Sequence, residues 1–429
     1  MACSARAAFF HTPKRRRPSD MQTQLAPQYQ GTPEGQEAEA ILRKCVHCGF
    51  CTATCPTYQL LGDELDGPRG RIYLIKQVLE GAQPTRKTQL HLDRCLTCRN
   101  CESTCPSGVQ YGHLVDIGRH IVEQAVERPA SEKVMRATLA QGLNSPLFAP
   151  AMKLGQAMRS FLPRALRDKV PPAQDAGHWP TRTHARRVLM LAGCVQPAMQ
   201  PNINAATARV LDAAGIQTLV APAAACCGGV KFHLNEQDAA LDQMRNNIDA
   251  WWPHIEQGVE AVVMNASGCG VTVKDYGHLL RHDPAYASKA KRVSELTRDL
   301  SELLPDITAA LGTQLAEHAR QCGTLAFHPP CTLQHGQQLR GGVEQHLGAL
   351  GFDIHLAPAE SHLCCGSAGT YSVLQPEIAG QLRDRKLGHL GALKPQAIVS
   401  ANIGCITHLQ SGTGTPVRHW VELLDQCLV

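Results

Sequence analysis

The sequence is poor in aromatic residues and lacks any long apolar segment. Phe, Tyr and Trp together account for 4% of the 429 residues. No apolar run approaches the roughly 18 residues that a membrane-spanning helix needs, so no transmembrane helix is expected. No glycine-rich nucleotide fingerprint follows a predicted strand, and Arg340-Gly341-Gly342 is predicted to be a loop.

The sequence also lacks an excess of charge of one sign outside its first 20 residues. The formal net charge is +5, and residues 1–20 hold five basic side chains against one acidic side chain. The remaining chain offers no basic surface, so no nucleic-acid partner is expected. Pro18-Ser19-Asp20 follows the arginines where an export signal would have an apolar stretch. We interpret residues 1–36 as a disordered leader and expect a cytoplasmic protein, or one peripheral at the inner membrane.

Cysteine is abundant by contrast. The chain has 19 cysteines, as many as its aromatic residues together. A small disulfide scaffold is excluded by the length of the chain, and an odd number of cysteines cannot form a fully paired framework. The composition, 43% hydrophobic and 18% charged, is that of a globular protein of two or three domains. The cysteines therefore indicate metal or redox chemistry in a reducing compartment.

Eight cysteines form two copies of the run Cys-x2-Cys-x2-Cys-x3-Cys-Pro. The copies begin at Cys45 and Cys95, 50 residues apart. This run is typical of bacterial ferredoxins, in which three cysteines bind one 4Fe–4S cluster and the fourth binds the other. Structural zinc sites seldom use two such four-cysteine runs, each followed by proline. The expected ligand sets are Cys45, Cys48, Cys51 and Cys105 for the first cluster, and Cys95, Cys98, Cys101 and Cys55 for the second.

Helical periodicity surrounds these two runs. The apolar spacing predicts a helix over residues 71–79 that ends before Gly81, and a second helix over residues 113–126. We therefore predict a mainly helical ferredoxin-type domain over residues 37–130. A helical connector and a proline-containing linker are expected over residues 131–187.

The connector contains an amphipathic stretch whose role the sequence leaves open. Leu147, Met158 and Phe161 belong to its apolar residues, and Lys153 and Arg159 to its basic ones. Such a pattern favours either a peripheral membrane contact or a segment packed between domains with its charges in solvent.

The rest of the chain is an internal repeat. In each half a short apolar run precedes a single cysteine, Cys194 or Cys331, and a Cys-Cys-Gly motif follows 32 or 33 residues later. A last cysteine, Cys269 or Cys405, comes 43 or 41 residues after the first cysteine of the pair. Short β runs alternate with helical patterns, which indicates parallel α/β sheets.

The two halves are predicted to span residues 188–305 and 320–429. We therefore predict an α+β multidomain protein, with a mainly helical two-cluster ferredoxin domain followed by two repeated α/β (Rossmann-like) Cys-Cys-Gly halves. Cysteines that follow parallel strands are expected to meet at the carboxyl edge of the sheet.

Each half is thus expected to gather four cysteines at one cofactor-binding site. Three interpretations stay open for these sites: a further iron–sulfur centre, a thiol redox site, or buried structural cysteines. Cys3, Cys322 and Cys427 belong to no set and are expected to be ordinary thiols. The candidate residues are Cys194, Cys226, Cys227 and Cys269 in the first half, and Cys331, Cys364, Cys365 and Cys405 in the second.

The double ferredoxin run followed by two Cys-Cys-Gly repeats resembles the iron–sulfur subunits related to heterodisulfide reductase. Several stretches are more specifically similar to the glycolate oxidase (glycolate dehydrogenase) iron–sulfur subunit family. In the heterodisulfide reductase pattern the repeat ends in Cys-x2-Cys, whereas this sequence has Ala266 and Asn402 at the first of those positions. This departure argues against an unusual active-site cluster and against disulfide chemistry. The stretches that carry the resemblance are Cys45–Arg71, Leu92–Pro106, Asn246–Trp252, Ser361–Tyr371 and Ala401–Cys405.

The resemblance implies a subunit of an oxidoreductase complex. Flavin-type partner subunits, at least one of them carrying FAD, would oxidise glycolate to glyoxylate. This chain would relay the electrons through two 4Fe–4S clusters, and through any further centre in the repeats, to a quinone or another membrane acceptor. The alternatives are the iron–sulfur subunit of a related lactate or glycerol-3-phosphate dehydrogenase, a thiol–disulfide reductase, and a zinc-stabilised interaction protein.

Overall fold

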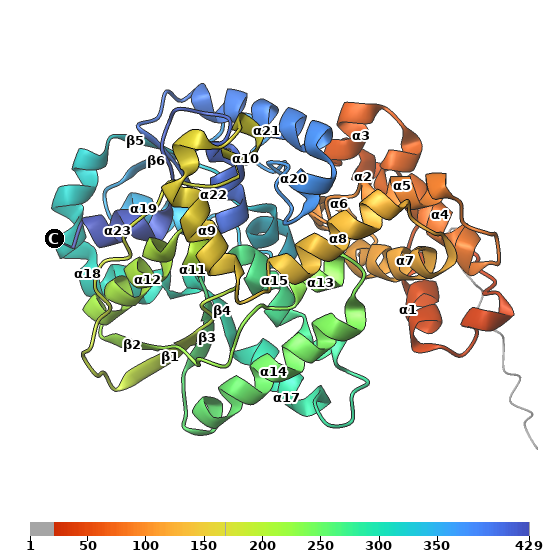
Figure 1. The fold of residues 1–429 in the computed structure, drawn as a ribbon, viewed down its shortest axis with the longest axis horizontal. Helices are drawn as coiled ribbons and strands as arrows, with labels where there is room; N and C mark the ends of the chain where they lie inside the picture. The colour runs from red at the N-terminus through yellow and green to blue at the C-terminus, as the bar shows by residue number, and fades with distance from the viewer. Residues whose placement is uncertain (1–20, 168, 429) are drawn as a thin grey trace, which may run out of the picture.

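The computed structural model describes residues 21–167 and 169–428, and it shows three regions side by side (Figure 1). A helical N-terminal region lies at one end of the molecule. Two α/β halves, coloured green to cyan and cyan to blue, form the rest. This arrangement confirms the predicted fold class.

The N-terminal region is built from seven helices around the two cysteine runs. α4 begins with Pro68 at its first turn, where the missing N–H of proline costs nothing. Its Ile72, Ile75 and Val78 are buried against α7, which accounts for the helical periodicity of the sequence. The helices are α1 (Pro33–Leu42), α2 (Phe50–Ala53), α3 (Pro56–Leu61), α4 (Pro68–Leu79), α5 (Arg86–Asp93), α6 (Asn100–Thr104) and α7 (Tyr111–Ala125).

Part of the segment predicted as a disordered leader is ordered in the structure. Residues 1–20 lie outside the described residues. Residues 21–36 contain a 3-10 turn at Pro27–Tyr29 and the start of α1. The backbone N–H of Ala26 donates to the carbonyl of Leu79 at 2.8 Å, so this segment packs against the end of α4.

The connector crosses the molecule as short helices and then runs without regular structure. Its helices are α8 (Ala130–Gly142), α9 (Phe148–Ala157) and α10 (Arg164–Arg167). α9 contacts α11 of the first half, and Gln156 donates to backbone carbonyls there. None of the described helices is long and apolar enough to cross a membrane.

Each half contains a four-stranded parallel sheet, in the order β2-β1-β3-β4 in the first half and β6-β5-β7-β8 in the second. The matching orders confirm the repeat. The register pairs Val188 of β1 with Ala261 of β3, and Leu325 of β5 with Ala397 of β7. The strands are β1 (Arg186–Met190), β2 (Ile216–Leu219), β3 (Ala261–Met264), β4 (Thr297–Asp299), β5 (Thr324–Phe327), β6 (Asp353–Leu356), β7 (Ala397–Ser400) and β8 (Val417–His419).

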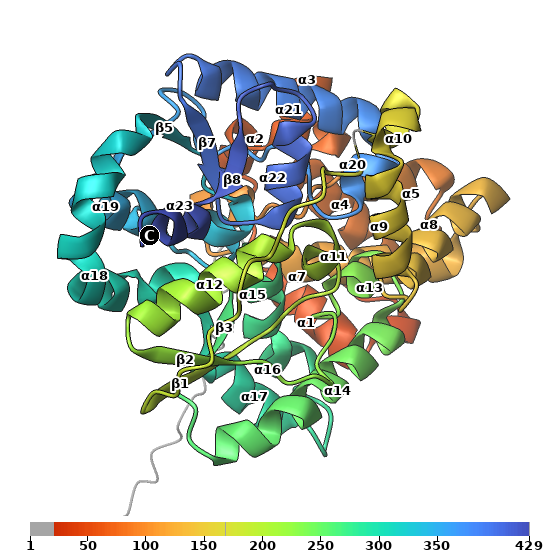
Figure 2. The ribbon, with the colours of Figure 1, turned by 60° about the vertical axis from the view of Figure 1, so that its left-hand side comes forward.

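Helices cover the sheets, as Figure 2 shows for α12 and α14 of the first half. Those of the first half are α11 (Gln196–Met199), α12 (Pro201–Ala213), α13 (Gly229–His233), α14 (Gln237–Glu256), α15 (Ser267–Lys274), α16 (Tyr276–Leu279) and α17 (Ala287–Leu296). α18 (Leu304–Ala319) connects the two halves. The helices of the second half are α19 (Gly342–Ala349), α20 (Tyr371–Leu374), α21 (Pro376–Gly391), α22 (Ile403–Gln410) and α23 (Trp420–Gln426).

The two halves share one apolar core, which runs from Val188 of β1 to Trp420 of α23. Two polar contacts between the halves lie where β3 and β7 end. The backbone N–H of Ser267 donates to the carbonyl of Ala401 at 3.1 Å, and that of Gly268 donates to Oδ1 of Asn402 at 3.2 Å. The predicted domain boundaries stay predictions, because the shared core gives no sharp division between the halves.

Candidate metal centres

The two ferredoxin-type runs adopt the same backbone path. Each begins directly after a helix, since Cys45 follows α1 and Cys95 follows α5. The second and fourth residues after each first cysteine have positive φ, 55° at His47 and 84° at Gly49 in the first run, and 51° at Thr97 and 56° at Arg99 in the second. These left-handed turns curl each run so that its thiols face one side.

The structure brings the first predicted ligand set together. One cavity is lined by all four of its thiols and also by Cys101 of the other set. This cavity opens at the surface, where the Cys48 thiol, Val46 and Phe50 are exposed. His47 is exposed as well. The four thiols are those of Cys45, Cys48, Cys51 and Cys105.

The second predicted set lies deeper. The charges of Cys98, Cys95 and Cys55 all act on the Cys101 thiol, so the four lie near one another. Burial is the largest cause that raises the pKa of both Cys98 and Cys101 well above its usual value. The hydroxyl of Tyr111 contacts the sulfur of Cys95 at 3.6 Å. Cys105 thus lies with the first run and Cys55 with the second, and the use of these thiols as cluster ligands stays a prediction.

Burial raises the pKa of the Cys45, Cys98 and Cys101 thiols above its usual value. Burial raises the pKa of Cys51 to about 11. Metal binding therefore has to displace protons, and the ligands become thiolates only when the metal is present. The chemistry of these donors fits a 4Fe–4S cluster, which is held by thiolates.

The spacing of the donors also distinguishes a cluster from a single ion. A tetrahedral zinc ion, with Zn–S bonds of about 2.3 Å, holds its sulfurs within about 4 Å of one another. Three compact groups of potential ligands occur among the described residues, and none contains a thiol of the ferredoxin-type runs. The eight thiols are thus arranged more openly than a single zinc ion requires.

Buried arginines hold the runs in place. Arg71, 1% exposed, bonds to the carbonyl of His91 at 2.7 Å and to Asp66 at 3.3 Å. Arg119 donates to the carbonyls of Leu92 and Cys95 at 2.8 and 2.6 Å. These bonds fix the backbone on either side of the second run.

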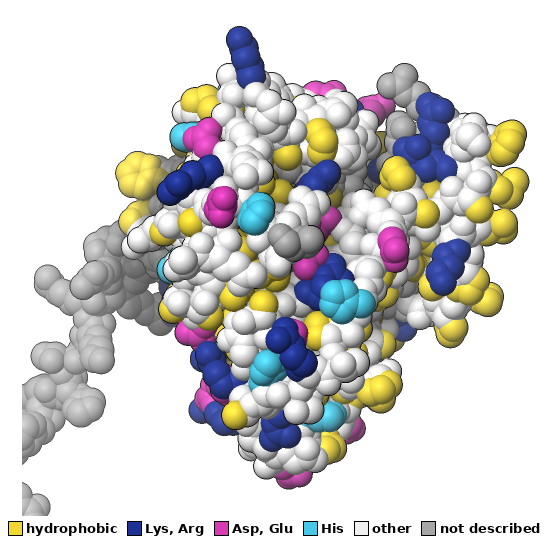
Figure 3. Space-filling view, turned by 90° about the vertical axis from the view of Figure 1, so that its left-hand side faces the viewer, with side chains coloured by type: hydrophobic (Ala, Val, Ile, Leu, Met, Phe, Trp, Pro, Cys, Tyr) yellow, Lys and Arg dark blue, Asp and Glu magenta, His cyan; other side chains and the backbone are white. Residues whose placement is uncertain are grey.

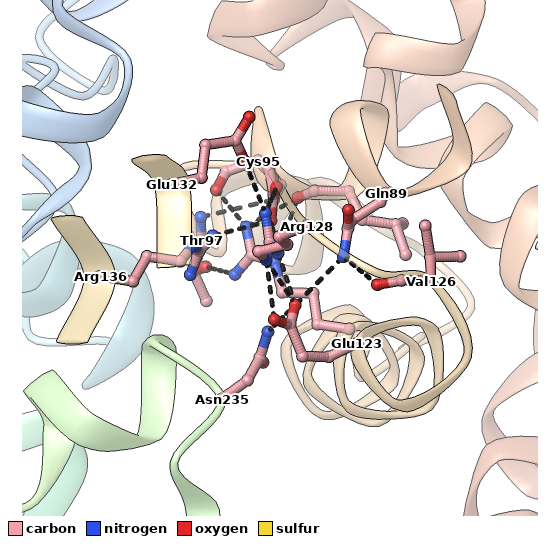
Figure 4. A network of polar contacts seen from close by, with 12 residues as sticks. Gln89, Cys95, Thr97, Glu123, Val126, Arg128, Glu132, Arg136 and Asn235 are labelled. Carbon is pink, nitrogen blue, oxygen red and sulfur yellow. Dashed lines mark hydrogen bonds and ion pairs between the residues drawn. The ribbon is translucent and has the colours of Figure 1, made fainter. Parts of the chain in front are cut away.

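A third arginine connects this region to the first half. Arg128 bonds to Asp93 and Glu123 at 2.6 to 3.0 Å. Figure 4 shows Arg128 beside Glu123 and Asn235. Glu123 in turn accepts a hydrogen bond from Asn235 of the first half at 3.2 Å. The network therefore orients the ferredoxin-type region relative to the α/β body.

The four cysteines of the first half meet beyond the carboxyl ends of β1 and β3. From β1 the chain first adds β2 on one side of the sheet and then β3 on the other, and ligands of parallel sheets bind at such a switch point. Hydrogen bonds connect Cys226 to Cys194 and Cys227, and Cys227 to Cys269. The hydrogen bonds from Cys194 and Cys227 hold the pKa of Cys226 well below its usual value. Gly228 has a φ of 89°, and a Cβ there would meet the carbonyl of Ala240 at 3.0 Å.

The second half repeats this arrangement with deeper burial. The sulfurs of Cys331 and Cys364 are 3.7 Å apart, and the N–H of Gly366 donates to Cys364 at 3.4 Å. All four cysteines of this half are buried. Each predicted set of four is thus gathered by the fold, and its use as a ligand set stays a prediction.

The two positions without the expected extra cysteine have another role in the structure. Ala266 and Asn402 lie at the contact between the halves. Besides accepting from Gly268, Asn402 directs its amide toward the sulfur of Cys405 at 3.6 Å. A contact between the halves therefore occupies the place where a fifth thiol would lie.

The ferredoxin-type region packs against the site of the second half. Cys98 and Leu96 share an apolar cluster with Cys331 and Cys364. The charge of Cys331 helps to raise the pKa of Cys98, and the charge of Cys98 helps to raise the pKa of Cys364. The second predicted cluster set is thus adjacent to the second Cys-Cys-Gly site.

Several residues near this site escaped the sequence analysis, because no motif marks them. His328 is buried beside Cys365 and Cys405. Burial lowers the pKa of the nearby Lys386 to about 8, and its ammonium donates to the carbonyl of Glu360. His335 lines a cleft between the two regions and bonds to Ser103 at 3.0 Å. A helical or strand period carries no information about such long-range neighbours.

The remaining cysteines lie apart from these sites. Cys322 and Cys427 lie next to each other, and burial raises the pKa of Cys427 to about 12. Cys3 lies outside the described residues. No cluster ligand is assigned to these three.

The sequence matches two protein families. A 4Fe-4S dicluster domain matches residues 41–109, and a cysteine-rich domain matches twice, over residues 188–274 and 325–410. These spans contain every cysteine of the two ferredoxin-type runs and of the two Cys-Cys-Gly sites.

Among curated proteins, the chain is similar to the glycolate oxidase iron-sulfur subunit of Escherichia coli (strain K12), with 57% identity covering 95% of this chain and 99% of that protein. A probable glycolate oxidase iron-sulfur subunit of Bacillus subtilis (strain 168) is 30% identical, covering 87% and 89%. Lactate utilization protein A of Geobacillus thermodenitrificans (strain NG80-2) is 26% identical, covering 56% and 98%.

Proposed function

The chain belongs to the family of glycolate oxidase iron–sulfur subunits, and we propose that it relays electrons from the flavin-dependent oxidation of glycolate to glyoxylate towards a quinone or another membrane acceptor. Membership in an oxidoreductase complex and an iron–sulfur role follow from the family. The substrate, the partner flavin and the direction of electron flow are the proposal.

One observation supports the relay most strongly. The first set of ferredoxin-type thiols opens to the surface, whereas the second is buried against the second half. In this proposal Cys45, Cys48, Cys51 and Cys105 hold the outer cluster, and Cys95, Cys98, Cys101 and Cys55 hold the inner one. Bound 4Fe–4S clusters would accept and pass one electron at a time.

The surface around the outer set suits a partner subunit. Val46 and Phe50 are 39% and 59% exposed beside the exposed Cys48. Exposed apolar side chains at the mouth of a redox site favour docking of another protein. We propose that the FAD-carrying partner docks here, because this chain has no nucleotide fingerprint of its own.

Residues of this chain set the charge and the access of water around the inner set. Arg71 and Arg119 neutralise part of the negative charge that thiolates bring into the interior. The apolar cluster around Leu96 and Tyr371 excludes water from the region between the inner set and the second half. The cysteines of both halves are proposed to bind further iron–sulfur centres.

The acceptor is proposed to lie at a membrane, which the connector would contact. Leu147, Leu154 and Phe161 are 73%, 63% and 82% exposed. Lys153 is exposed among them. Figure 3 shows hydrophobic side chains beside lysines and arginines along the edge where Figure 2 places α8, α9 and α10. One face of α9 packs on the first half, so the outward face is available to an anionic lipid surface.

Reconstitution with the flavoprotein partners tests the relay. In the Cys51→Ser variant, glycolate should still reduce the flavin, but reduction of an external dye acceptor should be lost. Cys322→Ser, a change at a cysteine outside all sets, should leave both unchanged. Loss of flavin reduction in Cys51→Ser as well would contradict a pure relay role.

A substrate panel tests the choice of glycolate. Glycolate should reduce the assembled complex faster than lactate or glycerol 3-phosphate does. A preference for lactate would instead assign the chain to lactate oxidation, in line with its similarity to the lactate utilization proteins.

A further inference from the structure

His328 occupies an unusual position beside the second Cys-Cys-Gly site. It is the first residue after β5, and its backbone N–H donates to the carbonyl of Val399 on β7 at 2.8 Å. Its side chain is 1% exposed. The two central strands of the sheet therefore hold this imidazole at the carboxyl edge, where ligands of such sheets bind.

The imidazole has no hydrogen-bond partner in the described part of the chain. Both Nδ1 and Nε2 are buried without a donor or acceptor within reach. Buried polar groups are normally satisfied by a hydrogen-bond partner, because an unpaired one destabilises the fold. A ring nitrogen of His328 instead lies within 4.8 Å of the sulfurs of both Cys365 and Cys405.

The first half has no equivalent of this histidine. Leu191 is the first residue after β1, and its N–H donates to Val263 of β3 at 3.3 Å, just as that of His328 donates to Val399. Leucine cannot bind a metal. The first half thus offers four donors, and the second offers four thiols and one imidazole.

We propose that His328 is a nitrogen ligand of an iron–sulfur centre held in the second half with Cys331, Cys364, Cys365 and Cys405. This inference rests on the proposed iron–sulfur content of the halves. Five donors exceed the four that a structural zinc ion takes, so the set suits a centre with more than one iron. His328 then supplies the fifth donor, while Asn402 occupies the place of the missing thiol.

A neutral imidazole in place of a thiolate removes one negative charge from the centre. Exchange of thiolate for imidazole raises the reduction potential of iron–sulfur centres. The centre lies next to Cys98 of the inner ferredoxin-type set.

Pulsed electron paramagnetic resonance on the anaerobically purified protein tests the ligand. The full chain should show a strong nitrogen-14 coupling that changes to a nitrogen-15 coupling when histidine alone is isotopically labelled. His328→Cys should retain the iron, lose this coupling and lower the potential of one centre. His328→Gln should lose the iron of that centre only.

His419→Gln is the matched control. His419 is equally buried and is the last residue of β8 in the same sheet, but its Nδ1 accepts a hydrogen bond from the N–H of Val421 at 3.1 Å. This variant should keep the histidine coupling and the full iron content. A coupling that persists in His328→Cys, or zinc in place of iron at the site, would overturn the inference.

These readouts separate the inference from the relay itself. Absence of a histidine coupling in a chain that still transfers electrons from glycolate would overturn only the role of His328. A histidine coupling in a complex that does not oxidise glycolate would keep the ligand and contradict the proposed substrate.

Discussion

The hydroxyl of Tyr371, in the second half, donates a hydrogen bond of 3.0 Å to the backbone carbonyl of Arg94, the residue before Cys95. The ring of Tyr371 packs with Cys331 and Cys364. One side chain thus connects the second cysteine run with the second Cys-Cys-Gly site, across 277 positions of sequence.

Replacing this tyrosine should weaken the connection. Tyr371→Phe leaves the partly buried Arg94 carbonyl without its partner, so the free energy of unfolding should fall by about 1 kcal/mol. Calorimetry should show a melting temperature lower by about 2 °C. Tyr286→Phe, which removes an exposed hydrogen bond to Asp249, is the control and should change it little. An equal loss in both variants would contradict a special role for Tyr371.

Crossed ligation predicts which double variants add their effects. Cys51→Ser should lose one cluster, about four iron atoms per chain. Adding Cys105→Ser should remove no more iron, because both residues serve the outer set. Adding Cys55→Ser should remove about four more, because Cys55 serves the inner set. Iron analysis of the anaerobic variants checks this. Extra iron loss on adding Cys105→Ser and none on adding Cys55→Ser would show that each run binds its own cluster.

The backbone turn at Gly366 should tolerate no side chain. Its φ is 91°, and a Cβ would lie 2.5 Å from the carbonyl of Ala379. Gly366→Ala should therefore destabilise the chain by about 2 kcal/mol or more and disturb Cys365. Gly369 also has a positive φ, 63°, but its Cβ position is open, so Gly369→Ala separates the strain from the clash. Thermal unfolding and iron content are the measurements.

The contact between α7 and the first half should depend on pH. His113 bonds to Asp275 at 3.1 Å, and its ring stacks on His278. Burial opposes the charged form of His113, but the hydrogen bond and the charge of Asp275 outweigh it and raise the pKa above 6.5. Burial likewise opposes the charged form of Asp275, but its hydrogen bond with His113 and nearby positive charges hold its pKa well below 3.8.

The direction in which stability changes with pH follows from the pKa shifts of His113 and Asp275. The contribution of His113 is complete below pH 6.5 and is lost as the pH rises through the raised pKa. That of Asp275 is present above pH 3.8 and is lost only as the pH falls through its lowered pKa. The melting-temperature difference between wild type and His113→Gln should therefore shrink as the pH rises above 6.5. His120→Gln, on the exposed side of α7, should show no such trend.

The exposed apolar side chains of the connector should carry vesicle binding. Phe161→Ser and Leu154→Ser each remove an apolar group worth about 1.5–3 kcal/mol on burial, so affinity for anionic vesicles should fall about tenfold or more. Tyr73→Ser, on the distant α4, is the control, since Tyr73 is also exposed. Equal binding of wild type and both connector variants in a flotation assay would rule out this contact.

The sequence by itself determined the units of this protein. Close cysteine spacings fix which thiols can share a loop, short apolar runs mark strands such as Thr324–Phe327, and an apolar period of 3.6 residues marks helices such as α4. These are local properties of the chain, so they could be recognised without a structure. The repeat was equally visible, because the spacings of its cysteines recur.

The tertiary structure alone decided how these units meet. Arg94 and Tyr371 lie far apart in the sequence, and nothing in either segment predicts their hydrogen bond. His328 differs from the other histidines only in its surroundings, a buried sheet edge with two thiols and no hydrogen-bond partner. Burial and long-range proximity arise when separate elements pack, so the distinction between an exposed outer set and a buried inner set became apparent only in the folded chain.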